Sequence, residues 1–307
     1  MERFVLRGAQ VLYGGSFGEM DVAVEGGRIA QVGQRLNGDV LRVEGYLLPG
    51  LIDEHIHGIC GSDAMQGAQA VEAMSRSLVR HGVTSFLPTT MNAGVEETRA
   101  AVEGAKEVMR AGSPGAFVAG VHMEGPFLGE KYRGAQDSRA NLPPSMENFA
   151  RLAGGAADVV RLITVAPELP GAQDFIRAAT RRGIVVSAGH TDATYEEMEA
   201  AVGWGLAQVT HLFNGMNPLH HRAPGVPGAA LTLSGLATQV IADGVHLHPA
   251  TVRLAVRSGA NILLITDSMR ATGLEDGVYD LGGQTVYVSG GVARLAAGNL
   301  AGSTLTL

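Results

Sequence analysis

Hydrophobic and polar residues follow two different patterns along this chain. Over residues 1–48 they alternate with period two, as in "DVAVEGGRIAQV", and the tight turn "EGGR" separates two such runs. Alternation places apolar side chains on one face of a strand, and two glycines between alternating runs are typical of a hairpin. We therefore predict a small β-domain over residues 1–48.

From residue 49 onward, continuous apolar runs of strand length alternate with segments of helical periodicity. Strands that alternate with helices form a parallel sheet, and continuous apolar runs suit strands that are buried on both faces. The predicted helices include residues 67–81, 94–111, 171–182, 193–203 and 249–258. The eight runs are "GLIDEHIH" (50–57), "VTSFLPTT" (83–90), "AFVAGVHME" (116–124), "VVRLITVAPE" (159–168), "GIVVSAGH" (183–190), "AQVTHLF" (207–213), "TQVIADG" (238–244) and "NILLITD" (261–267).

Eight strand–helix repeats are the number that closes a (β/α)8 barrel, so residues 49–307 are predicted to form one α/β barrel of the TIM-like type. An open, doubly wound sheet is the alternative. Such a sheet commonly opens with a glycine-rich loop for a dinucleotide, and the first repeat lacks that loop. Residues 280–300, after the eighth strand, are predicted to form an inserted hairpin.

Ionisable side chains stand at the ends of most of these predicted strands. Active sites of (β/α)8 enzymes lie at the C-terminal ends of the strands, so these groups are expected to converge on one mouth. Imidazole and carboxylate groups bind zinc, iron and other first-row divalent ions, which predicts a metal centre. In chain order the groups are His55, His57, Glu124, His190, His211, Asp243, His246 and Asp267.

The composition restricts partners and location. The 30 acidic residues outnumber the 23 lysines and arginines, and the net charge of −7 without a basic cluster argues against nucleic acid as a partner. The sequence has neither an 18-residue apolar run nor a signal-peptide core, so no membrane partner is expected. The single cysteine, Cys60, is typical of a reducing compartment, and we expect a cytoplasmic location.

The motifs around the ionisable residues resemble those of N-acetylglucosamine-6-phosphate deacetylases, a group of metal-dependent amidohydrolases. The resemblance covers nearly the whole chain and implies hydrolysis of N-acetylglucosamine 6-phosphate to glucosamine 6-phosphate and acetate. In family members C-terminal strands complete a small β-sandwich, so we expect this chain, which ends "AGSTLTL", to be truncated. The matching motifs are "PGLIDEHIHG", "HMEGPFL", "SAGHTDA", "THLFNGMNPLHHRAPG", "IADGVH", "TDSMRATG" and "LAGSTLT".

The same resemblance implies a role for each residue of the centre. Asp267 corresponds to the catalytic aspartate, which acts as general base and then as general acid. Some members have lost the His-x-His pair and use one metal; this chain keeps it, which leaves one or two ions, zinc or iron, open. The implied metal ligands are Glu124, His190 and His211 for a principal ion, and His55 and His57, with Glu124 bridging, for a second.

The resemblance also implies substrate-binding positions in loops. Arg222 and His246 resemble the phosphate-binding pair, with Arg222 reaching the site of the neighbouring subunit in a homodimer. Gln136 replaces a histidine that contacts the N-acetyl carbonyl in many members, and glutamine can donate a hydrogen bond but carries no charge. The remaining implied positions are Ala135, the backbone amides of Asn214 and Gly215, and the sugar-closing loop Leu300, Ala301 and Gly302.

Rival functions stay open at this point. A cyclic amidase with two metals commonly carries a carbamylated lysine at strand four, but this strand ends "TVAPE", far from Lys106 and Lys131. A deaminase would leave "HHRAPG" and "IADGVH" without a purpose. A non-catalytic metal-binding barrel would have no need for Asp267 as an acid–base group.

Overall fold

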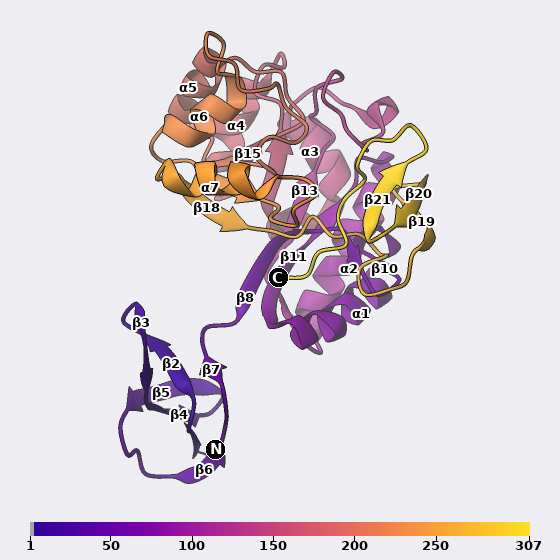
Figure 1. Cartoon of the computed structure of the whole chain (residues 1–307). Helices are drawn as coiled ribbons and strands as arrows, with labels where there is room; N and C mark the ends of the chain where they lie inside the picture. The colour runs from indigo at the N-terminus through magenta and orange to yellow at the C-terminus, as the bar shows by residue number, and fades with distance from the viewer. Residues whose placement is uncertain (1–2) are drawn as a thin grey trace. The chain divides into compact units, whose positions relative to one another are not determined.

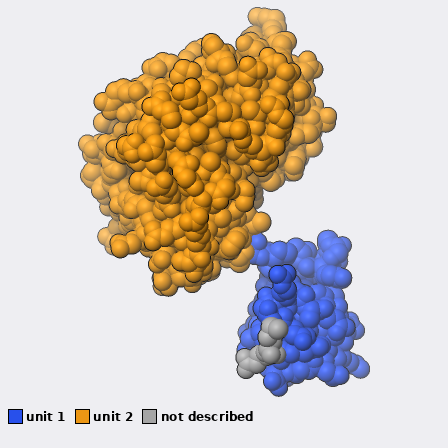
Figure 2. Space-filling model, turned by 180° about the vertical axis from the view of Figure 1, so that it is seen from behind, with its two compact units in different colours: residues 1–50 blue, residues 51–307 orange. Residues whose placement is uncertain are grey.

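The computed structural model describes residues 3–307, and the chain divides into two compact units, Met1–Gly50 and Leu51–Leu307 (Figure 2). In the first unit, short strands form two sheets with the orders β5-β4-β1-β6 and β3-β2-β7. The predicted "EGGR" hairpin is confirmed, because Glu25 of β4 pairs with Arg28 of β5 across the two glycines. The strands are β1 (Arg3–Arg7), β2 (Gln10–Tyr13), β3 (Ser16–Glu19), β4 (Asp21–Glu25), β5 (Arg28–Gly33), β6 (Asp39–Arg42) and β7 (Tyr46–Leu47).

The second unit is built around a parallel sheet that curves into a barrel, with helices on its outer side (Figure 1). Strand neighbours follow the chain in the order β8-β11-β13-β14-β15-β16-β17-β18, and the short β12 pairs with β11. The strands are β8 (Leu51–Ile56), β11 (Val83–Thr90), β12 (Phe117–Val118), β13 (Val121–Glu124), β14 (Val160–Val165), β15 (Val185–Ala188), β16 (Gln208–Val209), β17 (Ala237–Val240) and β18 (Asn261–Leu264).

The barrel is nearly closed by contacts between its first strand and the segment after its last. The backbone N–H of Asp267 donates to the carbonyl of His55, and that of His57 donates to the carbonyl of Ser268, both at 2.9 Å. Ile56 and Ser268 form a parallel bridge. The predicted α/β barrel is thus confirmed, and an open doubly wound sheet is wrong because such a sheet leaves its edge strands apart.

The helices follow the apolar periodicity of the sequence. In α4 the residues Ala172, Phe175, Ile176 and Ala179 are buried, which is the spacing of one helical face. Phe175 packs edge-on against Phe127, with ring centroids 4.7 Å apart. The helices are α1 (Ala68–Leu78), α2 (Val95–Ala111), α3 (Met146–Ala153), α4 (Ala172–Thr180), α5 (Tyr195–Trp204), α6 (Gly225–Thr232) and α7 (Pro249–Arg257), with 3-10 helices at Ala64–Gln66, Val79–His81, Ser138–Ala140 and Gly154–Val159.

Two helices and one inserted sheet differ from the sequence prediction. Helix α6 was missed because "GVPGAALT" is rich in glycine and proline, and α3 was missed because it is only eight residues long. The predicted hairpin within residues 280–300 is present as β20 (Gln284–Ser289) and β21 (Val292–Leu295), and a further antiparallel strand, β19 (Gly277–Leu281), pairs with β20. Two glycine pairs, 282–283 and 290–291, with positive φ angles supply two tight turns rather than one.

The remaining strands are β9 (Gly58–Ile59) and β10 (Ser62–Asp63), which pair with each other beside the first barrel strand. Within residues 3–307, each helix is too short or too polar to cross a membrane.

Candidate functional site

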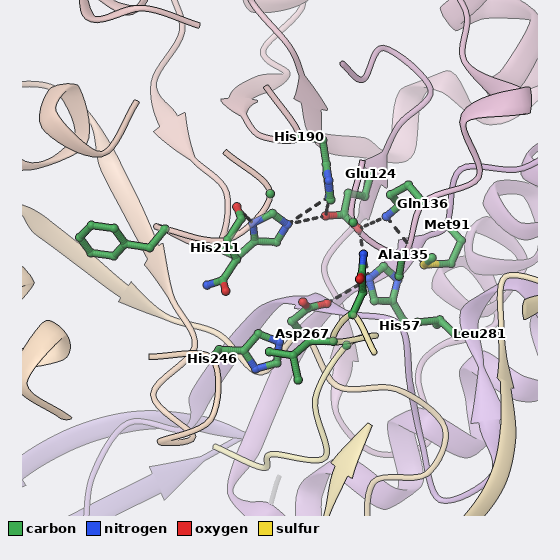
Figure 3. A pocket seen from close by; sticks show the side chains of 17 residues that line it. His57, Met91, Glu124, Ala135, Gln136, His190, His211, His246, Asp267 and Leu281 are labelled. Atoms are coloured by element: carbon green, nitrogen blue, oxygen red, sulfur yellow. Dashed lines mark hydrogen bonds and ion pairs between the residues drawn. The ribbon is translucent and has the colours of Figure 1, made fainter. Parts of the chain in front are cut away.

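A cavity of about 330 Å³ opens at the C-terminal ends of the barrel strands (Figure 3). Residues distant in sequence meet there because parallel strands bring their ends to one edge of the sheet. The sequence-predicted residues that line it are His57, Glu124, Ala135, Gln136, His190, His211, Asn214, Gly215, His246, Asp267, Leu300 and Gly302.

A first buried cluster joins Glu124, His190 and His211. Glu124 is the last residue of β13, His190 follows β15 by two residues, and His211 follows β16 by two residues. The Nε2 atom of each histidine lies 3.0 Å from Glu124 Oε1, and the two Nε2 atoms are 3.2 Å apart (Figure 3). Both histidines have positive φ angles, 49° and 29°, which turn the chain at the strand end and direct the rings inward.

A second buried cluster joins His55, His57 and Asp267. The two histidines lie two residues apart on one strand face, and their ring centroids are 5.3 Å apart. Asp267 Oδ1 lies 3.5 Å from His55 Nε2 and 3.2 Å from His57 Nε2. Glu124 Oε2 lies at 3.5 and 3.2 Å from the same two nitrogens, so this carboxylate stands between the clusters.

The electrostatics of the site favour ionised carboxylates. Burial raises the pKa of Glu124, but the charge of His55 and hydrogen bonds from His190 and His211 outweigh it and hold that pKa well below its ordinary value. Burial also opposes ionisation of Asp267, but His55 and His57 prevail and lower its pKa to about 2. Both side chains are therefore negative at neutral pH and able to accept protons or bind a cation.

The two clusters have the donor set of a metal centre. One ligand atom from each member of a cluster lies within 4.8 Å of the others, and all these side chains are buried. The Nε2 atom of His55 is buried without a hydrogen-bond partner among residues 3–307, although two carboxylates lie 3.5 Å away. An unpartnered imidazole nitrogen that faces carboxylates suits a divalent ion, so the residues fit a two-ion site.

Gln136 lies against Glu124 rather than free in the cavity. Its Nε2 donates to Glu124 Oε2 at 2.7 Å, and its Oε1 accepts from the backbone N–H of Asn92 at 2.8 Å. These contacts fix the orientation of the amide, because the carboxylate can only accept. Gln136 Nε2 therefore supports Glu124, and it also lies 3.9 Å from Met91 Sδ, a weak acceptor.

The other end of the cavity is made by loops. His246 Nδ1 lies 2.8 Å from Asp243 Oδ2, and Asp243 Oδ1 accepts from the backbone N–H groups of Val245 and His246. Gly215 has a φ of 59°, and a Cβ atom there would lie 3.0 Å from His190 Nδ1 and 3.2 Å from His211 Cε1, so only glycine leaves room for the two rings.

Three predicted residues lie outside the cavity lining. His55 is fully buried beneath it, and Ala301 is fully buried, with its backbone N–H bonded to the carbonyl of Ala293. Arg222 is exposed, and its Nη1 lies 2.7 Å from His221 Nε2. Within this chain the structure does not bring Arg222 to His246.

Some lining residues were missed by sequence reasoning. The missed residues include Met91, Phe213, Leu281 and Asn299. Met91 directly follows β11, so the rule of strand ends would have found it, but a search for ionisable groups passes over an apolar side chain. Leu281 belongs to the inserted sheet, whose contact with the mouth has no signal in the sequence.

Comparison with known proteins identifies the family. The profile of the Amidohydrolase family matches residues 46–283. An N-acetylglucosamine-6-phosphate deacetylase from Lysinibacillus sphaericus is 40% identical, over 94% of this chain and 76% of the relative. The chain belongs to the N-acetylglucosamine-6-phosphate deacetylases of the amidohydrolase family. An N-acetylgalactosamine-6-phosphate deacetylase from Escherichia coli O157:H7 is 38% identical to this chain, over 85% of it and 70% of the relative.

Solved structures of amidohydrolases agree with this assignment. A mutant of the Mycobacterium smegmatis N-acetyl-D-glucosamine-6-phosphate deacetylase, in complex with N-acetyl-D-glucosamine-6-phosphate, superposes with a TM-score of 0.92. It is 33% identical, and the match covers 100% of this chain and 81% of that one. The fold, the buried clusters and the sequence relationship of this amidohydrolase therefore point to one kind of chemistry.

Proposed function

We propose that this amidohydrolase removes the acetyl group of N-acetylglucosamine 6-phosphate, giving glucosamine 6-phosphate and acetate. The observation that carries the proposal is the pair of buried clusters around Glu124, beside a cavity of about 330 Å³, a size that suits a phosphorylated monosaccharide. The chemistry is assigned to the barrel, residues 49–307, rather than to the small β-domain, residues 1–48.

The metal content follows from the donor set. Glu124, His190 and His211 would hold a principal ion, and His55 and His57 a second, with Glu124 between them. Nitrogen and carboxylate ligands suit zinc or iron. A bound divalent ion would supply Lewis acidity and lower the pKa of water, which an unreactive amide substrate requires.

The residues of the chain perform the proton transfers. Asp267 accepts the proton of the attacking water, because its carboxylate is ionised and opens onto the cavity. It then delivers that proton to the nitrogen of the departing amine. Gln136 can stabilise negative charge on the former carbonyl oxygen by exchanging its weak contact with Met91 Sδ for one with that oxygen.

The phosphate is proposed to lie at the loop end of the cavity. His246, Asn214 and Gly215 line that end, together with Leu300 of the loop over the sugar. The backbone N–H of Asn214 already donates to the carbonyl of His211 at 2.9 Å, so of the two predicted backbone amides we propose only that of Gly215 as a phosphate donor. Ala135 and Gly302 complete the wall, whereas Ala301 supports the loop from the core. Because Arg222 is exposed and does not line the cavity of its own chain, we propose that it serves the site of a second subunit in a homodimer.

A galactosamine substrate is the second candidate, because one relative bears the name N-acetylgalactosamine-6-phosphate deacetylase. The two sugars differ only in the configuration at C4. Discrimination between them rests on one hydroxyl, which a hydrogen-bonding site can distinguish by large factors.

The test is a turnover assay with the metal-loaded protein. Acetate and free amine are measured with the two phosphosugars and with unphosphorylated N-acetylglucosamine. We expect N-acetylglucosamine 6-phosphate to give the highest kcat/KM, roughly ten- to a hundredfold above the plain sugar from one charged phosphate contact. Faster turnover of the galactosamine compound would select the second candidate. Equal rates on phosphorylated and plain sugar would overturn the substrate assignment, and no turnover with zinc or iron would leave a non-catalytic barrel.

A further inference from the structure

The four histidines of the two clusters are oriented in two different ways. Three of them direct Nδ1 to a backbone carbonyl, at distances of 3.0–3.1 Å. A carbonyl only accepts, so each of these rings carries its proton on Nδ1 and presents Nε2 to the site. The pairs are His57 with Thr89, His190 with Tyr132, and His211 with Asn214.

His55 is the exception, because a side chain takes the place of the carbonyl. Its Nδ1 lies 3.0 Å from Oε1 of Gln239, a fully buried residue of β17. An amide side chain can present either oxygen or nitrogen, so this contact alone does not choose the tautomer of His55.

Glu54 settles the choice. Gln239 Nε2 donates to Glu54 Oε1 at 3.0 Å, and the same oxygen accepts from Gln208 Nε2. A carboxylate only accepts, so the NH2 group of Gln239 must face Glu54 and its Oε1 must face His55. His55 therefore carries a proton on Nδ1, and Nε2 is the nitrogen left to bind an ion.

Nε2 of His55 faces a place where a cation is needed. Nε2 is buried without a hydrogen-bond partner among residues 3–307, and it lies 3.5 Å from Glu124 Oε2 and Asp267 Oδ1. Two carboxylates held this close to one buried nitrogen require a positive charge between them, which a bound divalent ion supplies. This observation is independent of the Gln239 contact and indicates the same site.

We infer that Gln239, held in turn by Glu54, is a positioning residue that fixes His55 in the tautomer needed to bind the second ion. The inference rests on the proposed function only in that metal binds at His55 and His57. In the Glu124–His190–His211 cluster both histidines hold Nδ1 against backbone carbonyls, so changes at Gln239 should affect this cluster less. There they remove only the acceptor of the His211 backbone N–H, which lies 3.4 Å from Gln239 Oε1. The orientation of the ligands thus depends on backbone carbonyls for the first ion and, at His55, on the Gln239 side chain for the second.

The test compares two glutamine variants. Gln239→Met keeps the length of the side chain and removes both its acceptor and its donors. Gln208→Met is the matched control, because Gln208 is also a buried residue that donates to Glu54 but makes no contact with His55. Zinc is titrated into chelator-treated protein and followed by calorimetry, with the zinc content of dialysed samples measured by mass spectrometry.

We expect the wild type and Gln208→Met to take up two ions, and Gln239→Met to bind one of them roughly 10–100-fold more weakly, the usual effect of losing a hydrogen-bond partner of a ligand. The exchanged double variant Glu54→Gln/Gln239→Glu keeps an acceptor at His55 and a donor–acceptor pair behind it. This double variant should recover most of the lost zinc affinity. If Gln239→Met does not fold, the zinc affinity of the double variant tests the inference in its place.

Three results would overturn the inference: a wild type that takes up a single ion, a Gln239→Met variant with wild-type affinity for both, or a double variant as defective as Gln239→Met. Failure of the proposed function looks different. In that case the wild type binds two ions and the variants behave as expected, but no acetate is released from either phosphosugar.

Discussion

The two ends of the cavity are built by different means. At the reacting end, buried side chains from the ends of β8, β13, β15 and β16 contact one another at 3.0–3.5 Å. At the other end, His246 stands on a loop with Asp243, and Arg222 is exposed away from it. Groups placed by the sheet cannot move independently, whereas groups on loops can be supplied by other segments or another subunit. We therefore expect changes at the reacting end to affect kcat and changes at the loop end to affect KM.

The largest effect is expected for Asp267→Asn. Asparagine keeps the shape of the side chain and cannot accept the proton of water. Loss of a general base that also serves as the acid should lower kcat roughly 10²–10⁴-fold, with little change in KM. Steady-state kinetics on N-acetylglucosamine 6-phosphate measure both constants.

Metal content is the control for Asp267→Asn, because Asp267 Oδ1 also lies 3.2 Å from His57 Nε2. A variant with normal metal content and nearly normal kcat would contradict the role of Asp267 in proton transfer. A variant that loses one ion would assign Asp267 to metal binding, and the reacting end would then have no separate base.

The two ends of the cavity also differ in how well the sequence predicts them, because one is built on strands and the other on loops. His55, Glu124, His190 and His211 were predictable because the apolar runs mark the strands and parallel strands align their ends. The partner of Arg222 was not predictable, because loop paths and subunit contacts leave no periodic signal.

Two further positions show where a signal exists and where it is missing. Gln239 was overlooked although a glutamine inside the apolar run "TQVIADG" marks a buried polar group that requires partners. The contact of Gln136 with Glu124 joins residues from a loop and a strand, and nothing in their spacing indicates which way the amide faces. Local pattern thus predicts the frame of the site, and the hydrogen bonds behind it need coordinates.

An intermediate effect is expected at the loop end. His246→Ala and Arg222→Ala should each raise KM for the phosphosugar and leave kcat within a few-fold of the wild type. Loss of a charge-assisted contact costs about 1.5–3 kcal/mol, or roughly ten- to a hundredfold in kcat/KM. Neither variant should change kcat/KM for unphosphorylated N-acetylglucosamine, which serves as the internal control. A similar loss with the plain sugar would place these residues elsewhere in the reaction.

Mixed subunits separate the two possible positions of Arg222. An Arg222→Ala chain and an Asp267→Asn chain are each defective, but in a hybrid dimer one site combines Asp267 of the first chain with Arg222 of the second. That site should recover activity, up to half of the wild-type rate per dimer. Verified hybrids without recovery would show that Arg222 serves its own chain or none, and the loop end would then be built within one subunit.

The smallest effect is expected for Asp243→Asn, which tests whether the loop end is independent of the reacting end. Burial raises the pKa of Asp243, but hydrogen bonds from the side chain and backbone of His246 outweigh it and lower that pKa, so the residue is an ionised acceptor at neutral pH. Asparagine retains one oxygen for the backbone N–H groups of Val245 and His246, which preserves the loop.

In Asp243→Asn the NH2 group faces Nδ1 of His246, and the imidazole can respond by carrying its proton on Nε2, where it still donates to a phosphate. Only the hydrogen bond between the carboxylate and Nδ1 of His246 is exchanged for a weaker one, at a cost of about 0.5–1.5 kcal/mol, or roughly a two- to tenfold rise in KM. Since Asp243 makes none of the contacts that hold either cluster, kcat and metal content should not change. A fall in kcat comparable to the rise in KM would mean that the two ends are coupled, and the division of the cavity into a chemical end and a binding end would be wrong.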